Sequence, residues 1–396
     1  MTPLAFQPTA RVWRAETTQA PVRLARLSEL TITDHLAWDA LSQAASADSV
    51  FAASWFVRSV LTHFDPQQYY RLFIVTGDDG SWDGVLVAAR TAQLGRVPLR
   101  HLSGLVDANQ FLGTPLVRPG AETAFWQRLF QGIDGGDLGC DALRLSEMPE
   151  DHRTAQALTT LCMLQERTVA TLNRKQRAYW CPKPDEAEDL LRHLPAKRRK
   201  RLAALERQLH DRHGPICFDS VNDEAELDIW LSEFLALELA GWKGKRGSAL
   251  ASDARSSLHF RYVAEMGFAN GSFRAVVLRA QKRPVAMSCY FVSDDKAFGF
   301  KMAYDENFAR YAPGIILTRK LMESHGTDTG LIFDSCSAPD AAMINELWPD
   351  RRSIADLVIE TGDFRNKSLF VAAMTTRKLW HRAKWGQRLA ALASPF

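Results

Sequence analysis

The stretch KMAYDENFARYAPGIIL, residues 301–317, decides the fold of this chain. Its first residues close an apolar run typical of a strand. Pro313 then stands where an apolar helical pattern begins, a position that favours proline. Backbone N–H groups at such a helix start are free to bind an anion such as a diphosphate. An ordinary strand-to-helix turn has the same pattern, so position alone leaves both interpretations open.

The segments around this stretch predict a mixed sheet with helices. Upstream, helical periodicity covers 223–242 and 255–268. Three strands joined by tight turns follow and indicate a meander. They span 273–280, 283–293 and 296–304. Downstream, the order is a helix over 314–325 ended by Gly326, a strand over 331–337, a helix near 340–348 and a strand near 353–360.

The N-terminal half repeats this order with little sequence identity, which indicates an internal duplication. Its expected helices are 54–64, 121–133 and 151–164, and its expected strands are 71–77, 82–90, 98–104, 142–147 and 166–172. We therefore predict an α/β protein of tandem duplicated domains, each a mixed central sheet flanked by helices. The expected units are an N-terminal domain over 1–175, a basic linker helix within 176–215, a C-terminal domain over 216–365 and a basic amphipathic tail over 366–396.

Composition narrows the function classes. The chain has 396 residues, 46% of them hydrophobic and 24% charged, which suits a well-folded protein of two domains. A net charge of +3 gives no reason to expect nucleic acid as a partner. The six cysteines have no metal-ligand spacing, so we expect reduced thiols and no metal. Without a signal peptide or a long apolar run, we expect a cytoplasmic protein.

Two basic segments stand out from this balanced composition. Residues 192–213 hold eight Lys or Arg and two acids. AKRRKR (196–201) is either the solvated face of the linker helix or a phosphate-binding patch. The tail 376–392 alternates cations with Trp380 and Trp385, which is typical of a helix at an anionic membrane surface. The tail either packs against the domain or contacts the inner membrane face peripherally.

ELAGWKGKRGSAL (238–250) carries the candidate chemistry. Glu238 continues the apolar stripe of the preceding helix, so its carboxylate is expected on the buried face beside Lys243. Burial raises a carboxylate pKa and a nearby cation lowers it, a combination that can produce a base near neutral pH. Gly241 is expected to end the helix, whereas Gly244 and Gly247 allow close approach of a ligand or backbone. The alternative is an ordinary Glu–Lys pair at a helix end.

Three runs together resemble one protein family. FLALELAGWKGKRGSAL, KMAYDENFARYAPGIIL and IFDSCS look like the CelD/BcsL-type branch of the GNAT acyltransferase superfamily, which is related to the Fem-type aminoacyl transferases. The resemblance is most specific from about 190 to 360. It implies two GNAT-like domains in tandem, with the active site in or beside the C-terminal one.

The resemblance also implies roles for individual residues. The family's E-x-x-x-W-K-G, K-x-x-Y and Y-x-P-G patterns and its later strand acid all have counterparts here. The implied catalytic residues are Glu238, Lys243, Tyr304 and Tyr311; the implied co-substrate contacts are Lys301, Met302, Ala303, Arg310, Pro313, Gly314 and Ile315; the implied substrate pocket holds Trp242, Gly247 and Asp334.

The implied reaction is N-acyl transfer by direct attack of a small-molecule or lipid amine on a thioester. The donor would be acyl-CoA or acetyl-CoA, with an acyl-carrier protein or a charged tRNA as alternatives. The usual phosphate loop places Gly three residues after its Arg or Gln, whereas Pro313 stands there and Gly314 follows one late, which favours a donor other than acetyl-CoA. A Fem-like aminoacyl-tRNA transferase, and a non-catalytic accessory protein of polysaccharide or lipid assembly, are the other functions considered.

Overall fold

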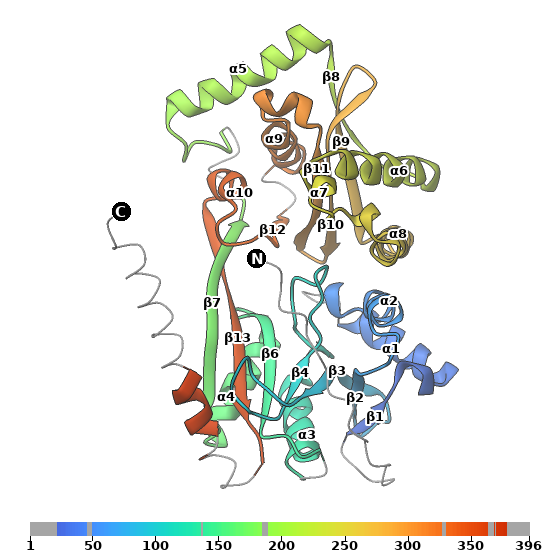
Figure 1. Cartoon of the computed structure of the whole chain (residues 1–396), viewed down its shortest axis with the longest axis vertical. Helices are drawn as coiled ribbons and strands as arrows, with labels where there is room; N and C mark the ends of the chain where they lie inside the picture. Colours follow the sequence, from blue (N-terminus) through green and yellow to red (C-terminus); the bar gives the residue numbers. More distant parts are fainter. Residues whose placement is uncertain are drawn as a thin grey trace.

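The computed structural model describes residues 22–45, 50–135, 138–183, 189–326, 330–362, 368 and 370–377. Figure 1 shows an N-terminal half and a C-terminal half stacked end to end and joined by two long strands. The described strands form one mixed sheet of thirteen, with helices packed on the part of the sheet in each half. The predicted α/β fold with a mixed central sheet flanked by helices is confirmed, and the sheets of the two halves are continuous with each other.

The N-terminal half follows the predicted order of elements. The helix expected at 54–64 has these bounds, and the strand expected at 82–90 is one residue longer. The first strand and the first long helix were not predicted. The elements are β1 (Arg23–Ala25), α1 (Ile32–Ala44), α2 (Ser54–Phe64), β2 (Arg71–Thr76), β3 (Trp82–Thr91), β4 (His101–Gly104), β5 (Leu116–Val117), α3 (Glu122–Asp134), β6 (Ala142–Pro149), α4 (Arg153–Leu164) and β7 (Val169–Trp180).

The C-terminal half begins after the helix α5 (Ala196–His213), which lies in the predicted linker. The three meander strands have the predicted bounds. Asp294, with a φ of +51°, makes the tight turn between the second and third of them. The elements are β8 (Ile216–Ser220), α6 (Glu224–Ala240), α7 (Trp242–Lys245), α8 (Ala254–Ala269), β9 (Phe273–Ala280), β10 (Arg283–Ser293), β11 (Lys296–Tyr304), the 3₁₀ helix η5 (Glu306–Tyr311), α9 (Pro313–His325), β12 (Ile332–Asp334), α10 (Ala342–Leu347) and β13 (Asp350–Glu360).

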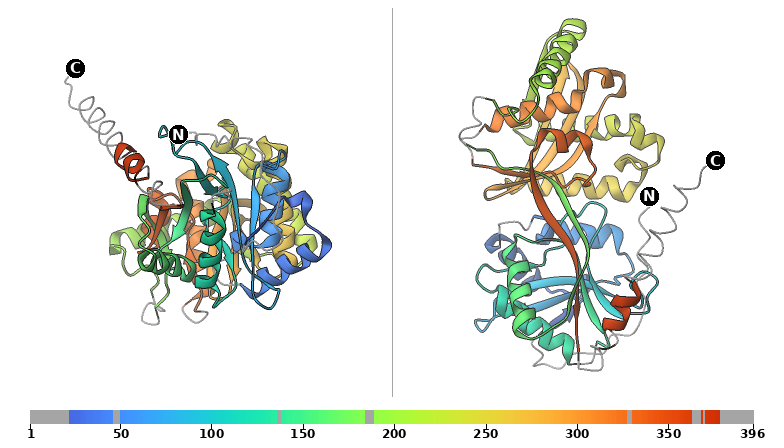
Figure 2. Two further views of the ribbon diagram at one scale, coloured as in Figure 1. Left: turned by 90° about the horizontal axis from the view of Figure 1, so that it is seen from below. Right: turned by 90° about the vertical axis from the view of Figure 1, so that its left-hand side faces the viewer.

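The two halves exchange their last strands. The sheet order is β1-β2-β3-β4-β6-β13-β7-β12-β11-β10-β9-β8. β7, from the N-terminal half, reaches the C-terminal half, where Trp180 pairs with Phe333 of β12. β13 runs the other way, and Glu360 pairs with Ala142 of β6. The two strands pair antiparallel with each other along most of their length, and they are visible as a crossed pair in Figure 2.

β7 is longer than the strand predicted at 166–172, and residues 176–180 of the expected linker belong to it. The polar run NRKQR in its middle has no alternation of apolar and polar residues, so periodicity does not predict this part of the strand. The strand forms despite its polar sequence because β13 pairs with the backbone N–H and C=O groups of β7. Ion pairs also neutralise the cationic side chains of this run. Lys175 pairs with Glu147 at 2.6 Å, and Arg174 pairs with Glu150 at 2.8 Å.

One aromatic core spans the boundary between the halves. Phe51 and Phe56 of the N-terminal half pack against Phe291, with ring centroids 6.3 and 6.0 Å away. Beside them, Ser59 of α2 and His259 of α8 form a buried hydrogen bond of 2.9 Å. Edge-to-face aromatic contacts stabilise this core beyond the effect of the buried apolar area alone. The packing therefore fixes the two halves relative to each other.

Candidate active site

The side of β11 that faces β12 is paired over only three residues. β12 runs parallel to β11, and the last matched pair is Phe298 with Asp334. The Ser335 N–H then donates to the β7 backbone at 3.1 Å, and Cys336 adopts a φ of +50°, so the chain turns away. Among the described residues, no strand pairs with Gly299–Tyr304 on this side. We call these six residues the open edge of β11.

Backbone groups of Met302 and Tyr304 point to the open edge. The Asp305 N–H donates to the β10 backbone at 3.0 Å. Along an antiparallel strand, successive residues direct their N–H and C=O groups to alternate sides. The backbone of Ala303 therefore also faces β10, whereas Met302 and Tyr304 face away from it. An N–H donor and a C=O acceptor are thus directed to the place where a second strand would lie.

Lys243 approaches this edge and is held there by Glu238. Its ammonium donates to Glu238 Oε1 at 2.6 Å and to the Met302 carbonyl oxygen at 3.3 Å. The second Glu238 oxygen accepts the Leu250 N–H at 2.7 Å. Glu238 lies on the buried side of α6, with 3% of its side chain exposed, whereas the Lys243 side chain is 25% exposed. The carboxylate therefore anchors a partly exposed cation against β11.

Glycines shape the turn that brings Lys243 into place. α6 ends at Ala240, and Gly241 leads into the four-residue helix α7. A Cβ on Gly244 would lie 1.7 Å from the Leu239 carbonyl oxygen, so only glycine permits this approach of two backbones. Gly247 has a φ of +66° with open space around it. Backbone geometry accounts for both glycines without a ligand.

The start of α9 lies beside the open edge. A Cβ on Gly314 would lie 3.5 Å from Met302 Sδ and 3.4 Å from Met343 Sδ. Pro313 has no N–H, and the Ile315 N–H donates to Ala312 O at 3.0 Å. Within the described residues, the Gly314 N–H makes no hydrogen bond. This donor and the helix dipole suit an anion, and Arg310, an exposed residue four positions earlier, adds a positive charge to the segment.

Lys301 is surrounded by groups from both halves. Its ammonium donates to Asn109 Oδ1 at 2.6 Å and lies over the rings of Phe111 and Phe300, at 5.4 and 5.1 Å from their centroids. Burial, and then the positive charge of Lys243, lower its pKa to about 8. Asn109 and Phe111 were missed by the sequence analysis, and no local pattern connects their loop with Lys301.

Tyr304 and Tyr311 lie in different surroundings. Tyr304 lines a pocket of about 440 Å³ between the C-terminal part of α6 and the ends of β10 and β11. Tyr311 is 2% exposed, and its hydroxyl contacts the Arg310 guanidinium and lies 3.2 Å from His213 Nε2 at the end of α5. The hydroxyl of Tyr311 is thus held beneath α5, whereas Tyr304 borders an open pocket.

The three residues expected to form the substrate pocket do not meet at the open edge. Asp334 is buried between Arg177 and Arg352, whose nitrogens lie 2.7 and 2.9 Å from Oδ2. Burial opposes ionisation of Asp334, but Arg177, and then Arg352, outweigh it and hold the pKa of this carboxyl below its usual range. Trp242 is 44% exposed and stacks on Arg246, and Gly247 faces open space.

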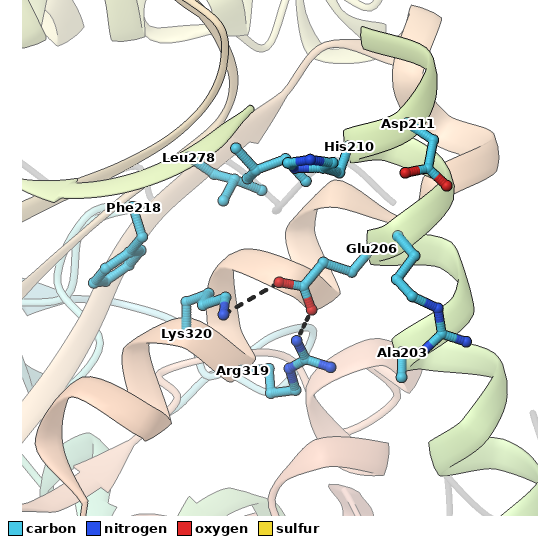
Figure 3. Close-up of a pocket in the computed structure, with 10 residues that line it drawn as sticks. Ala203, Glu206, His210, Asp211, Phe218, Leu278, Arg319 and Lys320 are labelled. Carbon is cyan, nitrogen blue, oxygen red and sulfur yellow. Dashed lines mark ion pairs between the residues drawn. The ribbon is translucent and has the colours of Figure 1, made fainter. Parts of the chain in front are cut away.

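A second hollow, of about 400 Å³, lies between α5, the β8–β9 edge and α9. Figure 3 shows Glu206 of α5 between the two cations of its floor, Arg319 and Lys320. Lys320 Nζ is 3.1 Å from the Glu206 carboxylate, and Glu323 pairs with both cations from the other side. Because these cations are already neutralised, the hollow offers less to an anion than the start of α9.

Other sequence expectations concern parts away from this edge. In the part of the chain that the structure describes, no three His, Cys, Asp or Glu side chains group to hold a metal ion. A search of the same residues finds no helix whose length and hydropathy suit a membrane span. Phe370 and Met374, at the start of the expected tail, pack on the N-terminal half. Residues 378–396, with most of the predicted amphipathic helix, lie outside the described residues.

Comparison with known proteins identifies the domain that carries this site. Residues 196–334 match the model of the family described as "Acetyltransferase (GNAT) domain". This part of the chain is therefore similar to a GNAT acetyltransferase domain, which supports a transferase. The CelD/BcsL branch is not resolved by this match. No curated protein matches the chain.

Several solved structures are similar to this chain at low sequence identity. A conserved protein of unknown function from Bacteroides thetaiotaomicron is 10% identical, with a TM-score of 0.52 over 87% of this chain and all of that chain. FemX is 12% identical, with a TM-score of 0.49 over 84% and 96% of the two chains. A tandem GNAT protein from the clavulanic acid biosynthesis pathway is 12% identical, with a TM-score of 0.40 over 86% and 99%. At 10% identity, the similarity to the Bacteroides thetaiotaomicron protein concerns the fold alone.

Proposed function

We propose that this protein is an N-acyltransferase of the CelD/BcsL type that transfers an acyl group from a thioester to an amine. The observation that carries the proposal is the open edge of β11, where Met302 directs backbone groups beside the start of α9. An acyl thioester needs an extended slot with a donor for its carbonyl oxygen and an anion site for its phosphates. The GNAT domain match covers this part of the chain.

Residues of the described chain fit the two ends of such a donor. The Met302 N–H, which faces the open edge, is proposed to donate to the thioester carbonyl oxygen, because a backbone N–H there stabilises the developing oxyanion. The Gly314 N–H and Arg310 suit the diphosphate of a CoA. When bound, the donor supplies an activated acyl group. The proposed first donor is acyl-CoA with a chain longer than acetyl, because Gly314 stands one residue later than the glycine of the usual phosphate loop.

The side chains around Met302 suit the proton transfers of this reaction. The amine nitrogen forms a bond to the acyl carbon while the carbon–sulfur bond breaks. The nitrogen loses a proton, and the thiolate gains one. Lys301, with a pKa of about 8, has a larger neutral fraction than an ordinary lysine and is the proposed proton acceptor. Lys243, fixed by Glu238, is proposed to place a positive charge beside the acyl oxygen, and Tyr304 to protonate the leaving sulfur.

The acceptor is proposed to be a small or lipid amine of envelope lipid, such as a ceramide-type product, or of polysaccharide biosynthesis. The pocket beside Tyr304 is the proposed place for it, since this pocket borders the strand end that carries Met302. Its walls combine Leu237 and Pro284 with the charged groups of Lys245 and Glu306. An amphiphilic amine suits such a mixed surface better than a uniformly polar one.

The test measures free thiol released from acetyl-, octanoyl- and palmitoyl-CoA and from acyl-carrier protein, each with a panel of sphingoid, amino-sugar and amino-acid amines. We expect amine-dependent release with a long-chain donor. Glu238→Gln should lower kcat/KM at least tenfold, because Lys243 loses its counterion. Glu265→Gln, on the exposed side of α8, is the matched control and should leave the rate unchanged. No release from any donor with any amine would refute the proposal.

A further inference from the structure

The N-terminal half contributes a group to the proposed active site. We propose that Asn109 is a positioning residue, which holds the Lys301 ammonium and thereby sets the pH at which Lys301 can accept a proton. This inference rests on the proposed function for its catalytic consequence. Asn109 lies in the segment 105–115, which joins β4 to β5 and which we call the junction loop.

The amide of Asn109 can point in only one direction. Asp107 Oδ1 accepts the Asn109 backbone N–H at 2.9 Å and its side-chain Nδ2 at 3.2 Å. Because the amide nitrogen donates to a carboxylate, the amide oxygen faces Lys301 and accepts a hydrogen bond from its ammonium at 2.6 Å. Asn109 is 5% exposed, so water competes little for this bond. Asp107 therefore determines that the oxygen of the Asn109 amide, and not its nitrogen, faces Lys301.

The junction loop is itself held at three places. The Phe111 carbonyl oxygen accepts from Arg177 Nη1 at 3.0 Å, and Gln110 Nε2 donates to Phe51 O at 3.2 Å. The Gly113 N–H donates to the β6 backbone at 3.2 Å, and a Cβ on this glycine would lie 2.1 Å from a β6 carbonyl oxygen. A loop fixed in this way presents Asn109 at a constant distance from β11, as a preorganised contact requires.

Every element packed around Lys301 contributes to its titration. Burial, and then the charge of Lys243 in α7, lower the pKa of Lys301. Three groups raise this pKa: Glu238 of α6, Cys289 of β10 and Asp107 of the junction loop. On α8, His259 is neutral, and the charge of Lys301 is one cause of its lowered pKa. In this balance the Asn109 oxygen is a hydrogen-bond acceptor that favours the charged form. Removing it must shift Lys301 toward the neutral amine.

The titration of Lys301 can be measured without any substrate. Protein labelled with ¹³Cε-lysine is titrated by NMR, and the Lys301 resonance is identified by its absence from Lys301→Met. Asn109→Leu should lower the titration midpoint by about one pH unit, because a hydrogen bond to a charged group is lost. Asn109→Asp, which adds a negative charge at the same place, should raise it by a similar amount.

Thr114→Val is the matched control, since it removes a buried hydroxyl of the same loop that makes no hydrogen bond among the described residues. Its midpoint should equal that of the wild type. Equal midpoints in wild type, Asn109→Leu and Asn109→Asp would overturn the inference, as would a shift of the same size in Thr114→Val. If Asn109→Leu does not fold, Asn109→Asp alone decides the question by the direction of its shift.

The catalytic consequence is tested separately. With the amine and donor found by thiol release, the lower pH limit of kcat/KM should follow the NMR midpoint in each variant, down in Asn109→Leu and up in Asn109→Asp. Shifted midpoints with no activity in the wild type would refute the proposed function but keep the contact. An active enzyme whose pH limit ignores these variants would refute the positioning role.

Discussion

Asp334→Asn tests whether the exchanged strands depend on a buried charge. Asp334 ends β12 and accepts hydrogen bonds from Arg177 of β7 and Arg352 of β13. All three side chains are nearly inaccessible, at 1–2% of their area. The single carboxylate thus ties the strand of one half to both exchanged strands. An asparagine has almost the same shape but presents an NH2 group and no negative charge to the guanidinium groups.

The expected loss of stability depends on the partners that each arginine retains in Asp334→Asn. Arg352 retains Asp151, whose carboxylate lies 2.9 Å away and is half exposed. Among the described residues, Arg177 has no second carboxylate partner, and its other contact is the Phe111 carbonyl oxygen. Leaving a buried charge without its counterion costs about 3–5 kcal/mol. We expect Asp334→Asn to lower the free energy of unfolding by that amount.

The assay is urea denaturation followed by tryptophan fluorescence at pH 7. Asp228→Asn is the matched control, since it removes an acid of an exposed ion pair and should cost less than about 1 kcal/mol. Arg177→Met combined with Asp334→Asn should cost less than the sum of the single changes, because the buried charges are removed together. A loss below 1 kcal/mol for Asp334→Asn, or strict additivity in the double variant, would refute the argument.

Three further predictions concern the glycines of the site and one buried histidine. Gly314→Ala places its methyl in ordinary contact and should leave the KM for acyl-CoA within twofold, whereas Gly314→Glu should raise it at least tenfold in the thiol-release assay. Gly244→Ala should destabilise the protein in urea by about 1–3 kcal/mol, because its Cβ would collide with a backbone carbonyl, whereas Gly241→Ala, with no atom nearer than 3.6 Å, should cost less. Burial holds the pKa of His259 at about 3 against an ordinary 6.5, so its contribution to stability is complete above pH 6.5 and is lost as pH falls toward 3. Between pH 6 and 4 the stability should fall by about 1.4 kcal/mol per pH unit from this group, and His259→Gln should reduce that slope in urea titrations.

The sequence predicted much of this fold because many segments have the periodicity and the turn residues typical of the structure that they adopt. The meander strands end at tight turns, and α2 and α6 carry clear apolar stripes, so their bounds could be read from periodicity. β12 is shorter than expected because Cys336 adopts a positive φ and bonds to Asp334 Oδ1 through its N–H at 3.0 Å. No residue pattern announces that turn, since a free cysteine there looks like the continuation of a buried strand.

The candidate site was predictable only where its members lie close in sequence. Glu238 lies in the last turn of α6 and Lys243 follows five residues later in α7, so their closeness in sequence predicts the ion pair. The contact between Lys301 and Asn109 joins residues 192 positions apart, and it depends on the stacking of two domains. Asn109 is an ordinary turn residue in its own context. A single sequence therefore predicts the part of the site that lies in the C-terminal half, but it does not predict the contribution of the N-terminal half.

The exchanged strand β7 connects the two features on which the proposed chemistry depends. It draws Ser335 toward its own backbone and pairs Arg177 with Asp334, which takes β12 away from β11 and leaves the open edge. The same Arg177 holds the Phe111 carbonyl oxygen and so fixes the junction loop over Lys301. One strand from the N-terminal half thus both opens the edge and places Asn109. On this argument the duplication is part of the site, since a C-terminal domain without β7 would lack the partner that separates β12 from β11.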